Sequence, residues 1–514
     1  MLGAAVPGAI LIGFGHVDIL GKNAGRVRTA LRGHDVPVTT VEAAAPRRWH
    51  AEYAWLARTW AQSPAPRGRG DPDGLARDVL IEAHGDRFTA VTPGTPAAQV
   101  PAGTVRLPGL TLPGLANAHS HAFHRALRGS PAAGGTFWTW RERMYAVAER
   151  LDPGRYFDLA RAVYAEMALA GVTCVGEFHY LHHDPAGRRY SDPNEFGWQL
   201  IRAAAAAGLR ITLLDACYLA GGFARGGKPV PLSGVQLRYG DGTAAAWAER
   251  VSAFGRDPLG MVAPHARIGA AIHSVRAVGP DQVPEIMAWS HAHGAPVHAH
   301  LSEQPLENAE CRAAFGSTPA ELLYEAGALG PRSTLVHATH LTERDVCLLG
   351  GSMSTVCMCP LTEADLADGI GPAPALAAAG SPLALGSDGH SVIDLIEEAR
   401  WLELSQRLAT RQRGHFSAAD LATAATAGGH ACLGWPQAGE IAPGAYADLV
   451  TLPLDSPRLA GGAGGPLATL FAAGTAADVR HVVASGMDVV RDGLHLLVAD
   501  VPGSLAAAIG AVLG

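Results

Sequence analysis

Eight apolar segments that end in polar residues, with Ala- and Leu-rich stretches between them, constrain the fold of this chain most. The segments are Asn117–His121, Val172–Tyr180, Ile211–Tyr218, Ile268–Arg276, Pro296–Glu303, Thr334–His340, Ser354–Pro360 and Leu383–His390. The intervening stretches include Tyr156–Ala170, Gln199–Ala207, Pro284–His293, Glu321–Ala326 and Pro374–Ala379, whose composition favours helix. Eight strands that alternate with helices indicate an α/β fold with a (β/α)8, TIM-like barrel, which takes about 250 residues. We predict that this barrel spans residues 113–436 and carries the catalytic site.

Strand-like sequence also occurs on both sides of the barrel region. Asp78–Glu82 and Val105–Leu112 precede it, and Gly439–Leu452, Val479–Val483 and Met487–Val490 follow it. Two β-rich ends around a long middle predict a small β-sandwich domain built from residues 51–112 and 437–500. Residues 1–50 are set apart as an N-terminal extension, to which we assign no function.

Composition limits the classes of partner that we expect. The chain has a formal charge of −7 and no long basic run, which argues against nucleic acid and anionic membranes as partners. Its seven cysteines form no CxxC pair, which favours a reducing, cytoplasmic setting. No apolar stretch approaches the ~20 residues needed to span a bilayer.

Histidines and acids at the predicted strand ends indicate a metal site. His119 and His121 close the first strand, and residues two apart in a strand point to the same face. His298 and His300 offer a further ligand on the fifth strand, and spacing alone cannot choose between them.

The sixth and eighth strands add His337 and Asp388 to this set. Each of these side chains could singly be a strand cap or a core histidine bound to a backbone carbonyl. A barrel, however, brings the carboxyl ends of strands 1, 5, 6 and 8 to one mouth. Four such strand ends together therefore favour one metal-dependent active site.

This constellation resembles the amidohydrolase superfamily, which has HxH after strand 1, His after strands 5 and 6, and Asp after strand 8. The segment Gly444–Leu452 resembles part of that family's small composite domain. Glu303, three residues after His300, resembles the deaminase branch, which usually binds one metal; this match selects His300 over His298. The resemblance thus implies one divalent metal ion held by His119, His121, His300 and Asp388. Zn²⁺ best suits three imidazoles and a carboxylate, although iron(II) or manganese could substitute.

A closer resemblance is to the formimidoylglutamate deiminase family within that superfamily, over about residues 50 to 500. The strings that carry it are Leu112–Ala126, Phe137–Tyr145, Glu177–Asp184, His273–Val278, Val336–His340, Cys357–Leu366 and Glu398–Glu403. The resemblance implies hydrolysis of N-formimino-L-glutamate to N-formyl-L-glutamate and ammonia, a step in histidine breakdown. It is also compatible with a homodimer.

The resemblance further assigns roles to site residues. Glu303, His337 and Asp388 would transfer protons, with Asp388 also touching the metal. The implied substrate-binding residues are His124, Arg141, Tyr180, His273 and Arg276. A substrate with two carboxylates suits arginine, whose guanidinium donates two parallel hydrogen bonds. Arg276 is expected at the end of strand 4 and Arg141 in the loop after strand 1. The alternatives are that Arg141 lies on an exposed helix and that Arg276 pairs with a nearby acid.

Three positions depart from the pattern of the resembling family. His124 stands where a Gln is usual, Gly389 where a Ser is usual, and Ile272 where a Pro is usual. These three changes do not affect the four predicted metal ligands. They leave a close formimino or amidine analogue as an alternative substrate. Two other functions also remain: a deaminase of an amino-heterocycle such as guanine, and a non-catalytic metal-binding barrel. Retention of Glu303, His337 and Asp388 argues against the last.

Overall fold

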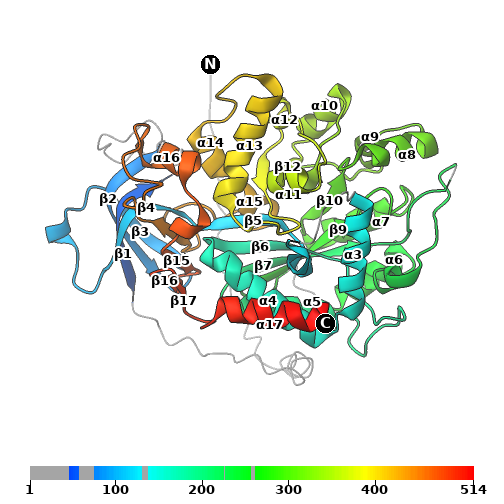
Figure 1. The fold of residues 1–514 in the computed structure, drawn as a ribbon, viewed down its shortest axis with the longest axis horizontal. Coiled ribbons are helices and arrows are strands. Elements are labelled where there is room, and N and C mark those ends of the chain that lie inside the picture. Colours follow the sequence, from blue (N-terminus) through cyan, green and yellow to red (C-terminus); the bar gives the residue numbers. More distant parts are fainter. Residues whose placement is uncertain (1–45, 57–73, 130–136, 225, 256–260) are drawn as a thin grey trace, which may run out of the picture. The chain divides into compact units, whose positions relative to one another are not determined.

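The computed structural model describes residues 46–56, 74–129, 137–224, 226–255 and 261–514. Most of the predicted N-terminal extension, up to residue 45, lies outside these residues. Within the part described, the strands form two sheets (Figure 1).

One sheet is the predicted barrel. Its eight parallel strands, in spatial order, are β5 (Leu115–Ser120), β6 (Val172–His179), β7 (Arg210–Cys217), β9 (Ala266–Ile272), β10 (Val297–Leu301), β11 (Ser333–His337), β12 (Thr355–Met358) and β13 (Leu383–Leu385). The short β8 (Met261–Ala263) pairs antiparallel with β9. A parallel bridge between Ser120 and Asp388 joins the first strand to the segment after the last. The eight predicted strands and the barrel class are confirmed.

Helices surround the barrel and follow its strands along the chain (Figure 1). They are α3 (Phe137–Arg150), α4 (Pro153–Leu169), α5 (Glu195–Ala207), α6 (Ala244–Ser252), α7 (Val283–His293), α8 (Pro305–Phe315), α9 (Pro319–Glu325), α10 (Glu343–Gly351), α11 (Pro360–Asp365), α12 (Ala373–Ala379), α13 (Leu395–Thr410), α14 (Ala418–Thr423) and α15 (Gly429–Cys432).

Local sequence explains where these helices begin and end. At α9 the Thr318 side chain accepts from the backbone N–H of Glu321, whose carboxylate accepts from the N–H of Thr318 in return. Such a capping box satisfies two N–H groups that the first turn leaves without partners. The helices α5 and α7 end at Gly208 and Gly294, where φ is 77° and 58° and a side chain would be strained.

The other sheet is mixed and comes from both ends of the described chain. Its strands, in order, are β17 (Leu494–His495), β16 (Met487–Arg491), β15 (His481–Ala484), β14 (Leu449–Leu452), β4 (Val105–Pro113), β1 (Arg47–Trp55), β2 (Leu75–His84) and β3 (Arg87–Thr92). Residues from both ends of this sheet, including Ile81, Phe88, Leu449 and Val483, share one hydrophobic cluster. The small β domain built from both chain ends is therefore confirmed. β1 includes the last residues of the segment 1–50, and the domain boundaries stay a prediction.

Two further helices accompany the C-terminal part of the chain. They are α16 (Gly465–Ala473) and α17 (Val501–Leu513). Helix α17 packs along α4 of the same chain (Figure 1).

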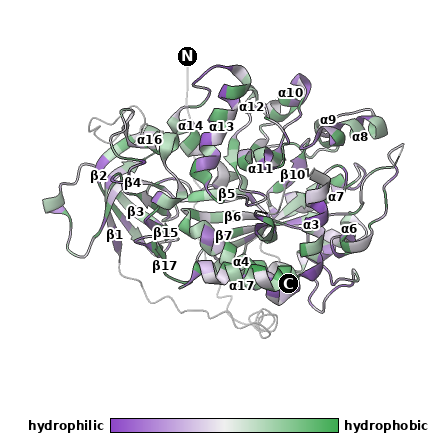
Figure 2. Cartoon of the chain, in the orientation of Figure 1, coloured by the Kyte–Doolittle hydropathy of each residue, from purple (hydrophilic) through white to green (hydrophobic). Residues whose placement is uncertain are grey.

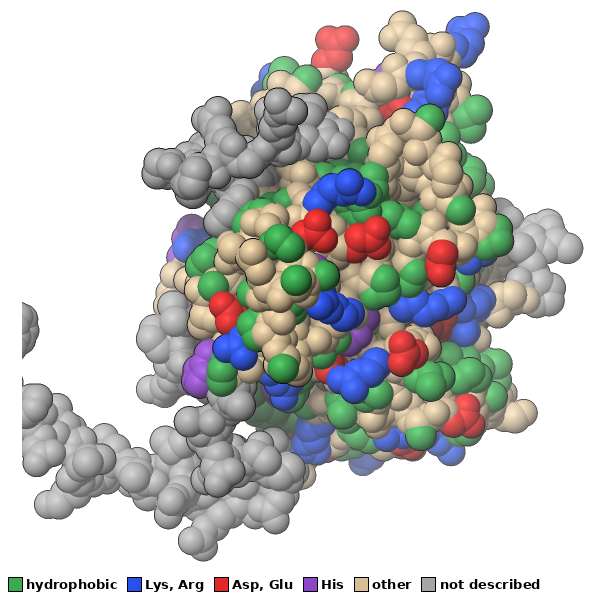
Figure 3. Space-filling view, turned by 90° about the vertical axis from the view of Figure 1, so that its left-hand side faces the viewer, with side chains coloured by type: hydrophobic (Ala, Val, Ile, Leu, Met, Phe, Trp, Pro, Cys, Tyr) green, Lys and Arg blue, Asp and Glu red, His purple; other side chains and the backbone are tan. Residues whose placement is uncertain are grey.

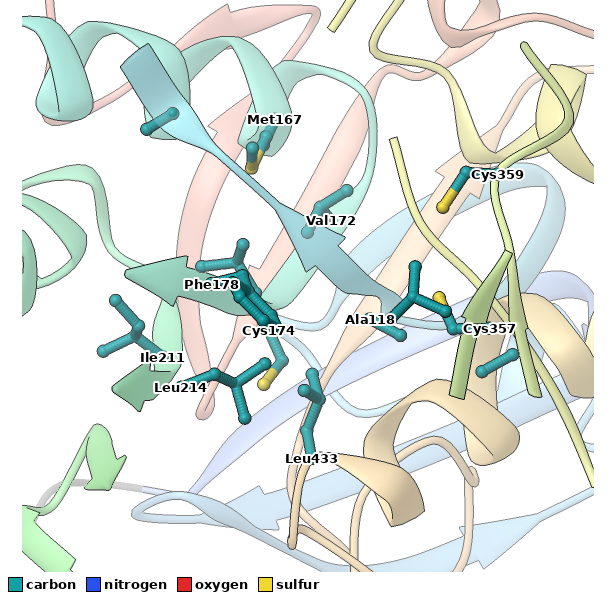
Figure 4. Packing of buried hydrophobic residues seen from close by; sticks show 14 of the residues in the cluster. Ala118, Met167, Val172, Cys174, Phe178, Ile211, Leu214, Cys357, Cys359 and Leu433 are labelled. Carbon is teal, nitrogen blue, oxygen red and sulfur yellow. The ribbon is translucent and has the colours of Figure 1, made fainter. Parts of the chain in front are cut away.

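The centre of the barrel is filled with small and medium-sized apolar side chains. Figure 4 shows Cys174 and Phe178 of β6 with Leu214 of β7 and Leu433 in this core. A Cβ atom at Gly176 would lie 2.4 Å from the Leu433 side chain and 2.7 Å from the backbone O of Ala118, and because the backbone cannot easily move, glycine is favoured here. Every residue of β6 and β7 is buried, as expected for strands covered on both faces.

The surface carries charges of both signs. Figure 3 shows acidic and basic side chains interspersed over the side on which the small sheet lies. Helix α13 carries both hydrophobic and hydrophilic residues (Figure 2), and its buried residues include Leu395, Ala399 and Leu402. Among the described residues, none of the helices combines the length and hydropathy needed to cross a membrane.

A buried ion pair ties the small sheet to the barrel. Arg210, the first residue of β7, donates from both Nη atoms to the two carboxylate oxygens of Asp448, with Nη1 to Oδ1 at 2.9 Å. Both side chains are 1% exposed. Asp448 also accepts from the backbone N–H of Ser485 at 2.8 Å, and its backbone O accepts from Gly114 at 3.1 Å. Burial opposes ionisation of Asp448, but Arg210 holds the pKa of this carboxyl below its ordinary value.

We expect Asp448→Ala to lower the free energy of unfolding by about 3–5 kcal/mol, because it leaves a buried guanidinium without its partner. Urea denaturation followed by circular dichroism measures this loss. The control is Arg188→Ala, which breaks the ion pair between Arg188 and Asp184. The Arg188 side chain is 79% exposed, so this change should lower the free energy of unfolding by less than about 1 kcal/mol. The contribution of Asp448 is present above its ordinary pKa of about 3.9 and is lost as the pH falls below it. Equal losses in the two variants would contradict the assignment.

Candidate metal centre and active site

Four side chains converge at the carboxyl ends of the barrel strands. His119 and His121 come from the end of β5, His300 from β10, and Asp388 from the segment after β13. The Nε2 atom of His119 lies 3.1 Å from that of His121 and 3.1 Å from that of His300. Asp388 Oδ1 is 3.2 Å from His119 Nε2 and 3.4 Å from His121 Nε2. The predicted ligand set is therefore brought together at one point.

The hydrogen bonds of these histidines direct their free lone pairs toward that point. Nδ1 of His121 donates to the backbone O of Phe178 at 2.9 Å, and Nδ1 of His300 donates to the O of His273 at 2.8 Å. Each Nε2 is then left without a hydrogen. Burial lowers the pKa of His119, His121 and His300, so the rings are neutral, as metal ligands must be.

The donor set fits a tetrahedral metal ion. Neighbouring lone pairs at 3.1–3.4 Å repel one another unless they share a cation. A regular tetrahedron with edges of this length has its centre about 2 Å from each corner, which is the Zn–N distance in proteins. Asp388 supplies the negative charge: burial opposes its ionisation, but the contact with His119 and the charge of His337 hold its pKa well below the ordinary value.

A buried hydrogen-bond network supports the ligands from behind. Ser120, between the two ligand histidines, donates to Glu177 Oε2 at 2.6 Å and lies 3.1 Å from His390 Nε2. The Nδ1 atom of His390 lies 2.9 Å from the hydroxyl of Ser387, which in turn accepts from Asn117 at 2.7 Å. These contacts fix the residues next to His119, His121 and Asp388.

The backbone around the site is strained. Ser302, His337, Ala338, Asp388 and His390 have positive φ values between 38° and 70°. Residues other than glycine rarely adopt this conformation, and they keep it only where the surrounding contacts over-determine it. All five lie just at or after the ends of strands 5, 6 and 8, where the site is built.

Glu303 and His337 stand beside the four ligands. His337 Nε2 lies 3.7 Å from Glu303 Oε1, and both side chains are buried. Burial raises the pKa of Glu303, partly offset by the charge of His337. Burial alone would lower the pKa of His337, but the neighbouring acids Glu303, Glu363 and Asp388 raise it well above its ordinary value. A carboxyl and an imidazole with shifted pKa values in one cleft are suited to proton transfer.

Five of these six side chains line one pocket of about 270 Å³; they are His121, His300, Glu303, His337 and Asp388, and His119 is not part of the lining. The pocket walls also include the predicted binding residues His124, Arg141, Tyr180, His273 and Arg276. Arg141 lies in α3, half-buried, rather than in a loop. Arg276 is buried, and its Nε has no hydrogen-bond partner among the described residues, but Glu307 and Glu303 lie near enough to raise its pKa.

The three residues that depart from the family pattern lie in different places relative to the pocket. His124 faces the pocket; its Nε2 lies 2.9 Å from the hydroxyl of Tyr180, and burial lowers its pKa to about 3. A Cβ at Gly389 would meet Thr362 at 3.5 Å, an ordinary contact, and neither Gly389 nor Ile272 lines the pocket. Only His124 is therefore placed to alter contacts with a ligand.

Sequence reasoning missed part of the pocket wall. Tyr218 follows β7, Tyr145 lies in α3, and Tyr239 follows a short 3-10 helix. Tyr218 ended a predicted strand and could have been found by the same rule as the ligands. Tyr145 and Tyr239 come from loops and helices, where no strand end marks them.

A second group of metal-binding residue types, His179, His182 and Asp215, is also buried. The Asp215 carboxylate is already taken by Arg250, which donates to its two oxygens at 2.7 and 2.9 Å, and by Trp247 at 2.9 Å. A guanidinium in this position occupies the place of a cation, and the group is a structural ion-pair network.

Comparison with known proteins agrees with this geometry. The sequence profile of the amidohydrolase family matches residues 110–489. The chain belongs to the amidohydrolase family. A formimidoylglutamate deiminase of Pseudomonas aeruginosa is 42% identical over 82% of this chain and 93% of its own length. An 8-oxoguanine deaminase of the same organism is 31% identical over 75% of this chain and 83% of its own. The crystal structure of an amidohydrolase from Brucella melitensis superposes with a TM-score of 0.78 and 31% identity, covering 91% of this chain and all of the other.

This amidohydrolase accordingly carries the kind of site that its family uses. The family is metal-dependent, and His119, His121, His300 and Asp388 form a group that could hold a metal ion.

We expect chelation to remove the metal and to lower the thermal stability of this amidohydrolase, and added Zn²⁺ to restore it. A ligand at a hundred times its Kd stabilises the folded state by about 2.7 kcal/mol. Calorimetry and elemental analysis measure both effects. His300→Ala should lose bound metal, whereas His298→Gln, two residues earlier on β10, should retain it, because His298 Nε2 contacts the O of Cys432 at 3.0 Å. Equal metal loss in both variants would contradict the ligand set.

Proposed function

We propose that this chain is a formimidoylglutamate deiminase that hydrolyses N-formimino-L-glutamate to N-formyl-L-glutamate and ammonia. The observation that carries the proposal is one pocket with a metal-ligand group at one end and two arginines, Arg141 and Arg276, in its walls. The 42% identity to a formimidoylglutamate deiminase over most of both chains supports it.

We propose one Zn²⁺ ion, held by His119, His121, His300 and Asp388. Imidazole and carboxylate ligands suit zinc, and a catalytic zinc ion can expand from four to five ligands, which would let it also take a water molecule. When bound, such an ion makes a nucleophile available from water at neutral pH and polarises the substrate.

The protein's own residues would then move protons and orient the substrate. Asp388 accepts the proton of the attacking water. Glu303 and His337, next to each other at the pocket wall, stabilise the tetrahedral carbon and deliver a proton to the leaving nitrogen. Water adds its oxygen to the formimino carbon, and the C–N bond to the terminal nitrogen breaks to release ammonia.

Binding of the glutamate part would depend on charge. Burial lowers the pKa of Arg276, but the nearby Glu307 and Glu303 more than offset this, so the guanidinium stays cationic. Arg141 and Arg276 would each receive a carboxylate of the substrate with parallel hydrogen bonds. His124, Tyr180 and His273 would contact the polar chain between the carboxylates and the formimino group.

The first test is ammonia release from N-formimino-L-glutamate by the zinc-loaded protein. We expect release by the wild-type protein and a loss of about 10²–10⁴-fold in kcat in Glu303→Gln, because the amide cannot exchange a proton. A coupled glutamate dehydrogenase assay measures the ammonia. Full activity in Glu303→Gln would overturn its role, and no release by the wild-type protein with metal bound would overturn the substrate.

The second test concerns the arginines. Arg276→Met should raise KM for N-formimino-L-glutamate by about 10- to 100-fold, since hydrogen bonds between charged groups are worth about 1.5–3 kcal/mol. Arg344→Met is the matched control, because Arg344 is 73% exposed and pairs with Glu321. An enzyme for a neutral amino-heterocycle should be indifferent to Arg276, so guanine and 8-oxoguanine are assayed in parallel. An unchanged KM in Arg276→Met would favour that alternative.

A further inference from the structure

His337 is held between two carboxylates, one at each ring nitrogen. Nε2 lies 3.7 Å from Glu303 Oε1, and Nδ1 lies 3.5 Å from Glu363 Oε1. The three side chains are 1%, 9% and 4% exposed, respectively. Glu303 and His337 line the substrate pocket, whereas Glu363 does not. Glu363 therefore approaches His337 from the side away from the proposed substrate.

The Glu363 carboxylate is fixed in this position. Glu363 lies in α11, and its Oε1 accepts from the backbone N–H of Cys359 at 3.0 Å. The backbone N–H of Glu363 in turn donates to the O of Cys359 at 2.9 Å. The same oxygen thus contacts Cys359 and His337, and the side chain cannot turn away without breaking the first hydrogen bond.

The His337 ring is also constrained from its own strand. His337 has a φ of 70° and Ala338 a φ of 50°, and the N–H of Ala338 donates to the O of Leu301 at 3.0 Å. The strained turn directs the ring into the gap between the two carboxylates. Because the Glu363 carboxylate next to Nδ1 can only accept a hydrogen bond, the ring keeps a hydrogen on Nδ1. Its Nε2 is then the atom that can exchange a proton.

We propose that Glu363 is a positioning residue for His337: it accepts Nδ1–H and so directs Nε2 toward Glu303 and the pocket. The arrangement follows the logic of a carboxylate that orients a catalytic imidazole from behind. A contact of 3.5 Å is expected to shorten when the substrate is bound, as such contacts do in active sites. The inference rests on the proposed function, because it concerns proton delivery in that reaction.

A nearby carboxyl provides the matched control. Glu398 is also fully buried and also holds the start of α11, where its Oε2 accepts from the N–H of Leu361 at 3.0 Å. It makes no ion pair with His337 among the residues that the structure describes. Glu363→Gln and Glu398→Gln therefore each replace a buried carboxylate that accepts one backbone N–H at the start of α11, and only the first replaces the partner of His337.

Kinetics of the zinc-loaded protein on N-formimino-L-glutamate test the proposal. We expect Glu363→Gln to lower kcat by about 10- to 100-fold with KM within about twofold of the wild type. Glu398→Gln should leave kcat within about twofold. In a His337→Asn background, Glu363→Gln should cause little further loss, because residues that act as a unit are not additive. The proposal would be overturned if Glu363→Gln lowered kcat as much in the His337→Asn background as in the wild type. It would also be overturned if Glu363→Gln and Glu398→Gln lowered kcat equally.

A spectroscopic measurement separates this inference from the substrate assignment. With ¹⁵N-labelled histidine, the His337 Nδ1–H signal is identified by its absence in His337→Asn. We expect it to move or vanish in Glu363→Gln and to persist in Glu398→Gln, whatever the substrate. An unchanged signal in Glu363→Gln would overturn the positioning role. If the wild-type protein releases no ammonia, the proposed function fails, and this signal alone decides the role of Glu363.

Discussion

The backbone hydrogen bonds between the end of β5 and the segment after β13 are the constraint on which the site depends. The N–H of Asp388 donates to the O of His119 at 3.0 Å, and the N–H of His121 donates to the O of Asp388 at 3.3 Å. These two bonds join the first and last strands of the barrel. They also place the Asp388 carboxylate against two imidazoles, so that closing the barrel assembles three of the four proposed metal ligands in the same step. His300 completes the set from the opposite wall.

This closure has an energetic cost that the surrounding residues offset. Asp388 and His390 adopt positive φ values, and three neutral imidazoles face one another with unshared lone pairs. The network of Ser120, Glu177 and His390 holds the strand ends in register behind the ligands. A strained backbone and converging lone pairs persist together only where the surrounding packing holds them in place. A cation shared by the imidazoles would remove the repulsion between their lone pairs. The site is therefore pre-organised by the fold itself.

The barrel was predictable from sequence because each apolar strand segment ends in polar residues and is followed by a helix-forming segment. Apolar strand runs ended in polar residues eight times, and the same rule pointed to the four residues of the candidate metal site. The rule gives no information on segments that are not strands. Arg141 was expected in a loop but lies in α3, and Tyr145 and Tyr239 reach the pocket from segments without strand periodicity. Their positions follow from long-range packing of connections around the barrel mouth, which no local pattern encodes.

The choice between His298 and His300 shows where the local pattern ends. The two residues share a face of β10, so alternation cannot separate them. Their positions along the strand separate them. A strand rises about 3.3 Å per residue, so His298 lies roughly 7 Å deeper in the barrel than His300. At that depth its Nε2 meets the O of Cys432, whereas Nε2 of His300 reaches His119 at 3.1 Å. Depth is fixed by register with the neighbouring strands, where His300 pairs with Val336 and His298 with Thr334. Register, which depends on the whole barrel, thus decides which of these two histidines joins the proposed metal site.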